Sequence, residues 1–396
     1  MSQHPLRIAY VTLGDPHDIR TWSGLSYHIA ESLKWQGAVI DYLGPLHTEE
    51  TLMMRAKRKF YTQALGRNFM EEREPSVTRA YARQVAEKLA LTSADVVLST
   101  HTELLADFDC PLPIAYWTDS NFAGMLNFYP YFCNLHPETI TTGHAMERRA
   151  LQRCQLAIYT SEWAANDAIK TYGADPAKVK VVPFGANIIC SRTGQDIRGL
   201  VAARPKNRCN LLFIGRIWDR KGGDVAMAVA KQLNDSGLPT RLTLIGSQPP
   251  NGPLPDYVRT AGFINKSTDE GRKRFDSLVA EAHFLIVPSR AEAFGLVFAE
   301  ASSFGVPSLT TNVGGIPGVV RDGGNGRMFP LDAPVQAWCD HVRGLMADYP
   351  RYEQLALSAF HEYQTRLNWQ VNGHKVYELL QEIVRPSELN PPPPPR

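Results

Sequence analysis

The sequence predicts an α/β protein built from two doubly wound parallel-sheet domains. Short β-branched runs alternate with longer helical patterns, which is typical of parallel sheets covered on both faces. The alternation restarts after about residue 208, and the 396 residues exceed what one hydrophobic core normally organises. We therefore expect two Rossmann-like domains whose strand ends face a shared cleft, because open α/β sheets bind ligands there.

The strands are expected in order along both halves. In the first half they are predicted at residues 7–13, 38–43, 95–100, 113–118, 156–161 and 179–184, with helices between them. In the second half they are predicted at residues 209–215, 241–246, 258–263, 283–289 and 306–311. From residue 333 to about residue 385 the pattern is helical.

These elements define the expected domain boundaries. Residues 1–187 form the first domain and residues 209–365 the second. Between them, residues 188–208 mix Gly, Pro and charge without strong periodicity, so we predict a linker there. A helix at 366–386 is expected after the second domain, and residues 387–396 form a proline-rich tail.

Composition excludes several classes of protein. Lys plus Arg number 42 and Asp plus Glu number 40, so no global field attracts nucleic acid. The six cysteines include no CxxC pair, which argues against a disulfide framework and a zinc site. The sequence shows no secretory signal, and no segment approaches the roughly 20 apolar residues of a membrane span. We expect a cytoplasmic protein that requires no metal.

Two glutamates follow the strand predicted at 283–289, in the stretch "SRAEAFGLVFAE". Glu292 is expected on the loop and Glu300 on the following helix, with Phe294, Gly295 and Leu296 as its first turn. The backbone N–H groups of such a turn suit a phosphate. On spacing alone, two exposed surface glutamates are the favoured interpretation.

Two further loops follow predicted strands. In "FIGRIWDRKGG", Arg216 and Lys221 flank a loop and could neutralise a diphosphate, although two solvated cations are an equal alternative. Near the N-terminus, Ser23 and Gly24 end a loop that is another candidate phosphate or sugar site, and Ser23 is expected to cap the next helix. An ordinary strand–helix turn is the alternative. No GxGxxG fingerprint is present there.

Taken together, "GRIWDRKGG", "VVPFGANI" and "SRAEAFGLVFAEASSFGVPSLTTNVGGIPGVV" resemble the family-four glycosyltransferases. The resemblance spans nearly the whole chain and is strongest from 209 to 330. It implies the GT-B fold, with an acceptor-binding first domain, a donor-binding second domain and a C-terminal helix that crosses back to the first. It also implies a retaining, metal-independent transfer from a nucleotide-diphosphate sugar.

The resemblance carries roles to individual residues of the second domain. Glu292 would lie beside the transferred sugar, and Glu300 would hold the ribose hydroxyls. Arg216 and Lys221 would stabilise the leaving diphosphate, assisted by backbone N–H groups of the turn at 294–296. Gly262 and Phe263 would lie in the loop that cradles the base, which would be that of a UDP- or GDP-sugar.

The first domain departs from the family pattern. Many members have a histidine after the strand equivalent to 113–118, and here Thr118 and Asp119 stand in that region. Asp119 could contact the acceptor or the sugar, and a turn or helix-cap role is an equal alternative. Ser23 and Gly24 replace a Gly-Gly pair. Gly318 replaces a glutamate that is usual after "GGIP".

The segment 53–74 is the strongest local charge feature of the chain, with four cations beside Met53, Met54, Phe60 and Tyr61. A basic amphipathic helix could rest on an anionic membrane surface, so the protein could be peripheral to a membrane. A solvated helix is the slightly favoured alternative, because Glu71, Glu72 and Glu74 dilute the charge.

The predicted function is therefore transfer of a hexose-type sugar to an unidentified glycan, lipid or small-molecule acceptor. One alternative keeps the fold and changes the reaction to that of a sugar-nucleotide epimerase or a phosphorylase. A second is a non-catalytic sugar-nucleotide-binding subunit, which the missing histidine allows.

Overall fold

The structure, a computed structural model, describes residues 4–48, 50–250 and 252–384. The chain divides into two compact units. Unit 1 runs to Val182 and resumes at Asn372, and unit 2 spans Pro183–Val371. The predicted proline-rich tail at 387–396 lies outside the described residues.

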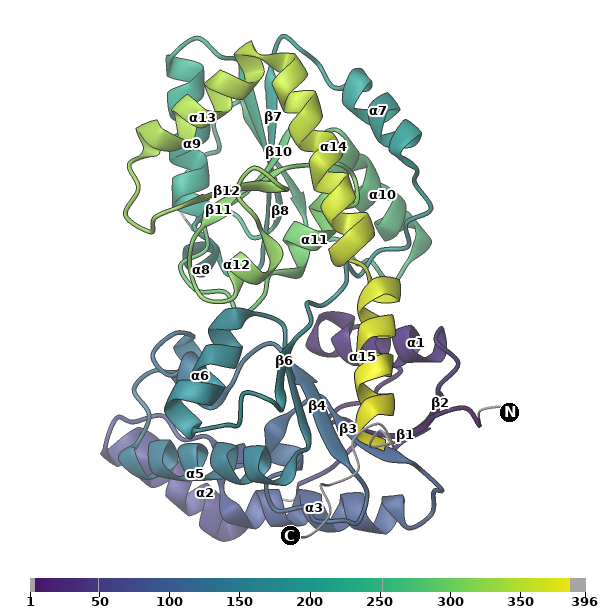
Figure 1. Cartoon of the computed structure of the whole chain (residues 1–396). Coiled ribbons are helices and arrows are strands. Elements are labelled where there is room, and N and C mark those ends of the chain that lie inside the picture. The colour runs from purple at the N-terminus through teal and green to yellow at the C-terminus, as the bar shows by residue number, and fades with distance from the viewer. Residues whose placement is uncertain (1–3, 49, 251, 385–396) are drawn as a thin grey trace, which may run out of the picture. The chain divides into compact units, whose positions relative to one another are not determined.

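Unit 1 is built on a six-stranded parallel sheet with the strand order β2-β1-β3-β4-β5-β6 (Figure 1). Its strands are β1 (Arg7–Val11), β2 (Val39–Tyr42), β3 (Val96–Ser99), β4 (Ile114–Thr118), β5 (Leu156–Tyr159) and β6 (Val179–Val181). Its longer helices are α1 (Leu25–Lys34), α2 (Leu52–Lys59), α3 (Pro75–Leu89), α5 (Pro137–Arg153) and α6 (Glu162–Tyr172). Short turns of helix are η1 (Thr21–Gly24), η2 (Phe60–Ala64), η3 (Glu71–Arg73), η4 (Thr102–Leu104), α4 (Phe122–Met125) and η5 (Pro130–Phe132).

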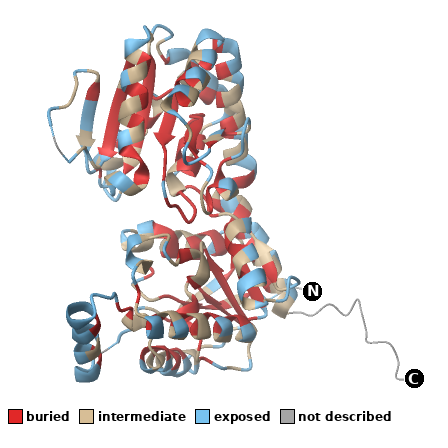
Figure 2. Cartoon of the chain, turned by 90° about the vertical axis from the view of Figure 1, so that its left-hand side faces the viewer, coloured by how far each residue is buried: buried red, intermediate tan, exposed pale blue. Residues whose placement is uncertain are grey.

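Unit 2 repeats this architecture with the order β12-β11-β10-β7-β8-β9, again with parallel neighbours. Its strands are β7 (Cys209–Gly215), β8 (Thr240–Gly246), β9 (Val258–Gly262), β10 (Phe284–Val287), β11 (Ser308–Thr311) and β12 (Gly326–Phe329). Its helices are α7 (Gly194–Ala203), α8 (Trp218–Lys221), α9 (Gly223–Asp235), α10 (Asp269–Ala280), α11 (Leu296–Ser302), α12 (Ile316–Val319), α13 (Val335–Ala347) and α14 (Tyr349–Arg366). Buried aliphatic and aromatic side chains fill the core between the sheet and these helices. Figure 2 colours most of the strand residues as buried.

These sheets confirm the predicted fold class, and all eleven predicted strands are present with ends that shift by a few residues. The twelfth strand, β12, was not predicted. It is a four-residue edge strand, Gly-Arg-Met-Phe, whose Arg327 is exposed. So short a run carries no alternation that distinguishes it from a loop.

The predicted linker at 188–208 differs from the structure, which places α7 within it. Thr193 and Asp196 form a capping box, in which each side chain accepts a hydrogen bond from the other residue's backbone N–H. Ile197 and Val201 are buried, so the helix packs onto unit 2 through one face. The division between the units falls earlier, between Val182 and Pro183.

The C-terminal helix α15 (Trp369–Val384) returns the chain to unit 1, as expected. It packs against α1 at very close range, because a Cβ atom on Gly373 would lie 2.7 Å from the Cβ of Ser32. Among the described residues, no helix combines the length and apolar character that crossing a bilayer requires.

Gly222 joins α8 to α9 and depends on being glycine. Its φ is +70°, and a Cβ at this position would lie 2.0 Å from the carbonyl oxygen of Pro288, on the loop after β10. The missing side chain thus lets the loops after β7 and β10 approach each other.

We expect Gly222→Ala to destabilise the protein by roughly 2–4 kcal/mol, because a backbone clash adds to the left-handed strain. The matched control is Gly237→Ala, whose φ is +86° with no heavy atom within 4 Å of the added Cβ. That change should cost only about 1 kcal/mol. Thermal unfolding of both variants tests the difference, and equal losses would contradict the proposed clash.

Candidate functional site

The strand order of unit 2 reverses between β7 and β10, which are adjacent although three strands apart in sequence. In open α/β sheets, ligands bind outside the carboxyl ends of the strands at such a reversal. The segments that follow β7 and β10 carry five of the predicted residues: Arg216, Lys221, Glu292, Phe294 and Gly295.

A buried ion pair joins these two loops. The Lys221 ammonium donates a hydrogen bond to Oε2 of Glu292, and both residues are less than 9 % exposed. A guanidinium nitrogen of Arg220 lies 3.7 Å from the same carboxylate oxygen and donates a 2.8 Å hydrogen bond to the carbonyl of Ala291. The surface-glutamate alternative therefore does not describe Glu292, which is a buried carboxylate held by cations.

Arg216 is exposed and occupies a different part of the loop. Its guanidinium carbon lies 5.9 Å from the ring centroid of Phe263, which follows β9 and is 69 % exposed. Gly262, between β9 and Phe263, has a φ of +67°. The predicted base-binding residues thus lie beside one predicted diphosphate-binding cation, and they present an aromatic face next to a positive charge.

Glu300 lies inside α11 and is 2 % exposed. The ammonium of Lys266 donates a hydrogen bond to its Oε1, and the Lys266 side chain is 37 % exposed. The surface-glutamate alternative fails here too. A carboxylate has about four lone-pair sites, so Glu300 can accept hydrogen bonds from hydroxyl donors as well as from the Lys266 ammonium.

The turn at Phe294, Gly295 and Leu296 differs from the prediction. The helix begins at Leu296, and Gly295 is its left-handed N-cap with a φ of +93°. Phe294 precedes the helix and is buried, with its ring 5.5 Å from that of Phe184. Any contact of this turn with a phosphate would therefore come from backbone N–H groups and not from the Phe294 ring.

Lys266 and Arg220 were not predicted from the sequence as site residues. Lys266 lies four residues after the end of β9, so its position after a strand was an available signal. Arg220 is the neighbour of Lys221, and only the structure shows that both face Glu292.

The remaining predicted residues, Ser23, Gly24 and Asp119, belong to unit 1. Ser23 is not the cap of α1: Gly24 occupies that position, and no side chain makes the cap hydrogen bond. The helix that follows Asp119, α4, is capped by Asn121. The Asn121 side chain accepts a 3.0 Å hydrogen bond from the backbone N–H of Gly124. The cap role that the sequence left open for Asp119 is therefore filled by another residue.

The loop before α1 has an unusual backbone. Trp22 and Ser23 have φ values of 46° and 56°, and Gly24 follows at 84°. Left-handed non-glycine residues cost on the order of 1–3 kcal/mol each and occur often at functional sites. The Trp22 ring lies 4.9 Å from that of His101, which follows β3, and burial lowers the pKa of His101.

A buried charged cluster lies beside His101 in unit 1. Arg73 is 3.6 Å from Oε2 of Glu103, and Oε2 of Glu147 accepts a 3.0 Å hydrogen bond from Thr102. Burial raises the pKa of Glu147 to about 7, although the charge of Arg73 opposes this shift. Near neutral pH this carboxyl is therefore partly protonated.

In the described ranges, no group of three His, Cys, Asp or Glu side chains has the geometry to hold a metal ion. Asp107 accepts a hydrogen bond from Thr78 and forms a 3.0 Å ion pair with Arg149, so its carboxylate is engaged within the protein.

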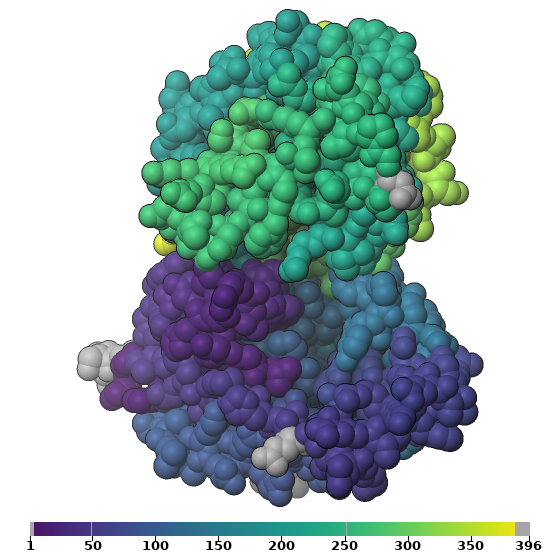
Figure 3. All heavy atoms as spheres, turned by 180° about the vertical axis from the view of Figure 1, so that it is seen from behind, coloured from purple at the N-terminus to yellow at the C-terminus, as the bar shows by residue number. Residues whose placement is uncertain are grey.

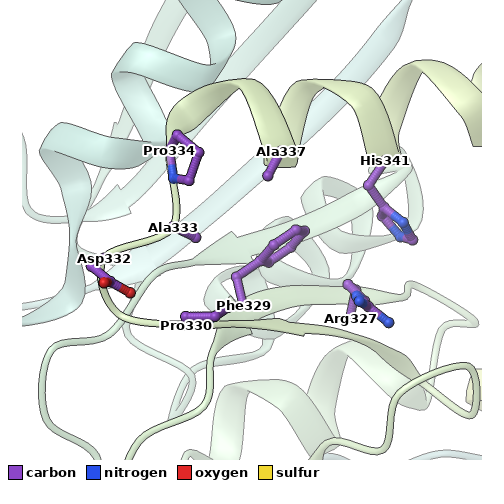
Figure 4. A pocket seen from close by; sticks show the side chains of 8 residues that line it. All are labelled: Arg327, Phe329, Pro330, Asp332, Ala333, Pro334, Ala337 and His341. Carbon is purple, nitrogen blue, oxygen red and sulfur yellow. The ribbon is translucent and has the colours of Figure 1, made fainter.

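A cavity of about 490 Å³ opens in unit 2 between the end of β12 and the start of α13 (Figure 4). Its walls include Arg327, Phe329 and His341, and Phe329 stacks on Trp338 with centroids 4.0 Å apart. None of the predicted site residues lines it.

The match to a known family lies in unit 2. Residues 208–348 match the family model described as "Glycosyl transferases group 1". The chain is 28 % identical over 228 residues to a D-inositol 3-phosphate glycosyltransferase of Nocardia farcinica, covering 54 % of this chain and 49 % of that one. It is 30 % identical over 210 residues to one of Mycolicibacterium paratuberculosis, covering 50 % and 46 %. The chain thus spans about half the length of the curated relatives it matches.

Solved structures match over nearly the whole chain. Sucrose-phosphate synthase from Thermosynechococcus elongatus aligns with a TM-score of 0.70 at 16 % identity, covering 97 % of this chain and 100 % of that one. Anabaena HepE, solved in complex with UDP and glucose, aligns with a TM-score of 0.62 at 17 % identity, covering 96 % and 100 %. Identities this low establish the fold alone.

We expect the pH dependence of stability to change in Glu147→Gln. The raised pKa of Glu147 means that its stabilising contribution is present below its unfolded pKa, near 4.5, and is lost as pH rises through about 7. From about pH 5 to about pH 8, the wild type should therefore lose about 2 kcal/mol relative to the variant. Parallel thermal unfolding curves at every pH would contradict this assignment.

The fold and the family match point the same way: the chain has the GT-B fold, and its residues 208–348 are similar to the family described as "Glycosyl transferases group 1".

Proposed function

We propose that this protein is a retaining glycosyltransferase that moves a hexose-type sugar from a nucleotide-diphosphate sugar to an acceptor hydroxyl. The observation that carries the proposal is the buried Lys221–Glu292 pair at the strand-order reversal of a group 1 domain. Burying an ion pair costs desolvation free energy, so a buried pair is weak evidence for a role in stability. Buried ionisable groups in contact with charged partners are concentrated at functional sites.

The donor would lie along the carboxyl ends of β7, β9 and β10. Its base would stack near Phe263 and Arg216, and its ribose hydroxyls would donate to the buried carboxylate of Glu300. Lys266 is the cation beside that carboxylate. Since an ammonium has three N–H donors, Lys266 can keep its bond to Glu300 and still donate to a bound hydroxyl or phosphate.

Charge develops on the leaving diphosphate as the bond between the sugar C1 and the phosphate oxygen breaks. Fixed cations stabilise this charge, and Lys221 and Arg220 are held in place by Glu292 and the carbonyl of Ala291. The acceptor oxygen would bond to C1 on the face from which the diphosphate leaves. Its proton would pass to an oxygen of that diphosphate. Arg216, which is more exposed, would reach the outer phosphate oxygens.

The identity of the donor base stays a choice between UDP- and GDP-sugars. The group 1 match covers residues of unit 2 and none of unit 1, so it supports a class of donor and bears little on the acceptor. Unit 1 supplies the remaining proposed residues: Ser23 and Gly24 as a candidate phosphate or sugar site, and Asp119 for contact with the acceptor or the sugar. A glycan, a lipid headgroup and a small polyol such as an inositol phosphate all fit this proposal, and the cytoplasm is the proposed location.

A thermal-shift screen with UDP-glucose, UDP-N-acetylglucosamine and GDP-mannose tests the donor class. A donor at a hundred times its Kd should stabilise the protein by about 2.7 kcal/mol. Binding without transfer or slow donor hydrolysis would favour the non-catalytic alternative, and an altered sugar configuration in the recovered nucleotide sugar would favour an epimerase.

The two glutamates should affect different steps. We expect Glu300→Gln to weaken binding of the donor found in the screen by roughly 1–3 kcal/mol, because a charged acceptor of hydroxyl hydrogen bonds is lost. Glu292→Gln should lower kcat more than it weakens nucleotide binding, because it disturbs the cations at the leaving group. Calorimetry and initial rates measure both, with the exposed Glu270→Gln as control. Equal losses of binding and turnover in both variants would contradict these roles.

Cations of the protein, and not a metal, are proposed to stabilise the leaving group. Turnover should therefore be unchanged when the enzyme is assayed with an excess of EDTA. Loss of activity that added Mg²⁺ or Mn²⁺ restores would overturn metal independence without affecting the proposed donor class.

A further inference from the structure

We propose that α2 and η2, with the loop that follows to residue 67, form a docking surface for an anionic lipid bilayer. This segment belongs to unit 1. The proposal does not rest on glycosyl transfer, because none of the donor-site residues belongs to the segment. At residues 53–74 the sequence left a membrane contact as an alternative to a solvated helix, and the structure limits the candidate surface to this one helical segment.

An apolar stripe runs along the solvent side of this segment. Leu52, Met53 and Phe60 are 83 %, 76 % and 54 % exposed, and Leu65 beyond η2 is 46 % exposed. At about 100° per residue, Leu52, Ala56, Phe60 and Met53 fall within an arc of about 100°. Figure 2 shows the segment almost entirely in the colour of exposed residues, and in Figure 3 it forms the indigo lobe of unit 1.

The opposite side of the same helix is firmly packed. Met54 and Tyr61 are 6 % and 7 % exposed, and the Tyr61 ring stacks on that of His136 with centroids 3.8 Å apart. Thr51 caps the helix by accepting a 3.2 Å hydrogen bond from the backbone N–H of Met54. The fold therefore holds the helix in a fixed rotation that turns the apolar stripe outward.

Cations border the stripe. Residues 51–70 contain five Lys or Arg and no Asp or Glu. On the helical wheel, Lys59 lies about 20° and Arg55 about 60° from Leu52, on the side away from Met53. Lys59 is exposed, and the ion pairs of this segment among the described residues involve Arg55, Lys57 and Arg58 but not Lys59. A helix with an apolar arc flanked by cations is the pattern that lies in the plane of an anionic bilayer surface.

Some of these cations have acidic neighbours. Arg55 and Arg58 form ion pairs with Glu50, and Lys57 forms pairs with Glu74 and Glu138. Lys57 is largely buried and fixes the inner side of the helix, whereas Arg55 is 63 % exposed. Exposed pairs contribute at most about 1 kcal/mol, so lipid phosphates can compete for Arg55.

A bilayer fits this surface better than a second copy of the chain. Packing two copies stripe to stripe would bring Lys59 and Arg55 of each into like-charge repulsion. A stable dimer also needs about 800 Å² from each partner, more than a single stripe on 13 helical residues presents. An anionic bilayer satisfies both the apolar stripe and its cationic border.

Vesicle flotation of the full chain tests the proposal. The wild type should float with vesicles of phosphatidylcholine and phosphatidylglycerol, and high salt or pure phosphatidylcholine should reduce binding severalfold. The variant Leu52→Ser/Phe60→Ser should bind at least about tenfold more weakly, because two exposed apolar side chains are lost. Arg55→Gln/Lys59→Gln should bind severalfold more weakly and lose most of the salt dependence.

Leu91→Ser and Lys170→Gln are matched controls, because Leu91 is 87 % exposed and Lys170 is exposed elsewhere in unit 1. Both should bind as the wild type does, and circular dichroism should show every variant folded. No flotation with anionic vesicles, or wild-type binding by Leu52→Ser/Phe60→Ser, would overturn the proposal. So would a dimer in sedimentation velocity that only the stripe variant loses, because the occupant would then be a second copy.

Discussion

The Lys221–Glu292 pair can exist only because two loops meet at the reversal of strand order in unit 2. A carboxylate this buried is stable only with a cation in contact, and an ammonium this buried needs an anion in return. Gly222 permits the close approach, since any side chain there would meet the carbonyl of Pro288. The other proposed donor-site residues of unit 2 depend on the same sheet, because they lie in the segments that follow β7, β9 and β10, with Glu300 farther along on α11.

In this arrangement the fold holds the charged groups of the candidate site in place before any ligand binds. Cations that would attract a diphosphate are already fixed by protein carboxylates and carbonyls, so little reorganisation is needed when charge develops. The same principle separates the two glutamates. Glu292 is tied to buried Lys221, whereas Glu300 is tied to Lys266, whose side chain reaches solvent. One carboxylate therefore organises cations within the protein, and the other stands behind a cation that a ligand can contact.

The sequence was sufficient for the fold class because β-branched apolar runs mark buried parallel strands wherever they occur. It also placed Glu292 and Lys221 correctly after strands. It could not show that they touch, because 71 positions separate them and their contact depends on β10 lying beside β7. The helix α7 was missed although Thr193 and Asp196 carry a capping signal, since two glycines weaken its periodicity. Ser23 failed as a cap because its backbone is left-handed, which no residue type reveals in advance.

The return of α15 to unit 1 makes unit 2 an insertion within unit 1. The inserted segment begins and ends at adjacent points, because the N–H of Ala186 donates to the carbonyl of Leu367 at 2.9 Å and Trp369 donates to Asn187 at 2.8 Å. During synthesis from the N-terminus, all six strands of unit 1 emerge before unit 2 does. The surface of α1 around Ser32, against which Gly373 packs, then stays uncovered until unit 2 has been made. Unit 1 is thus the first to begin folding and the last to be completed.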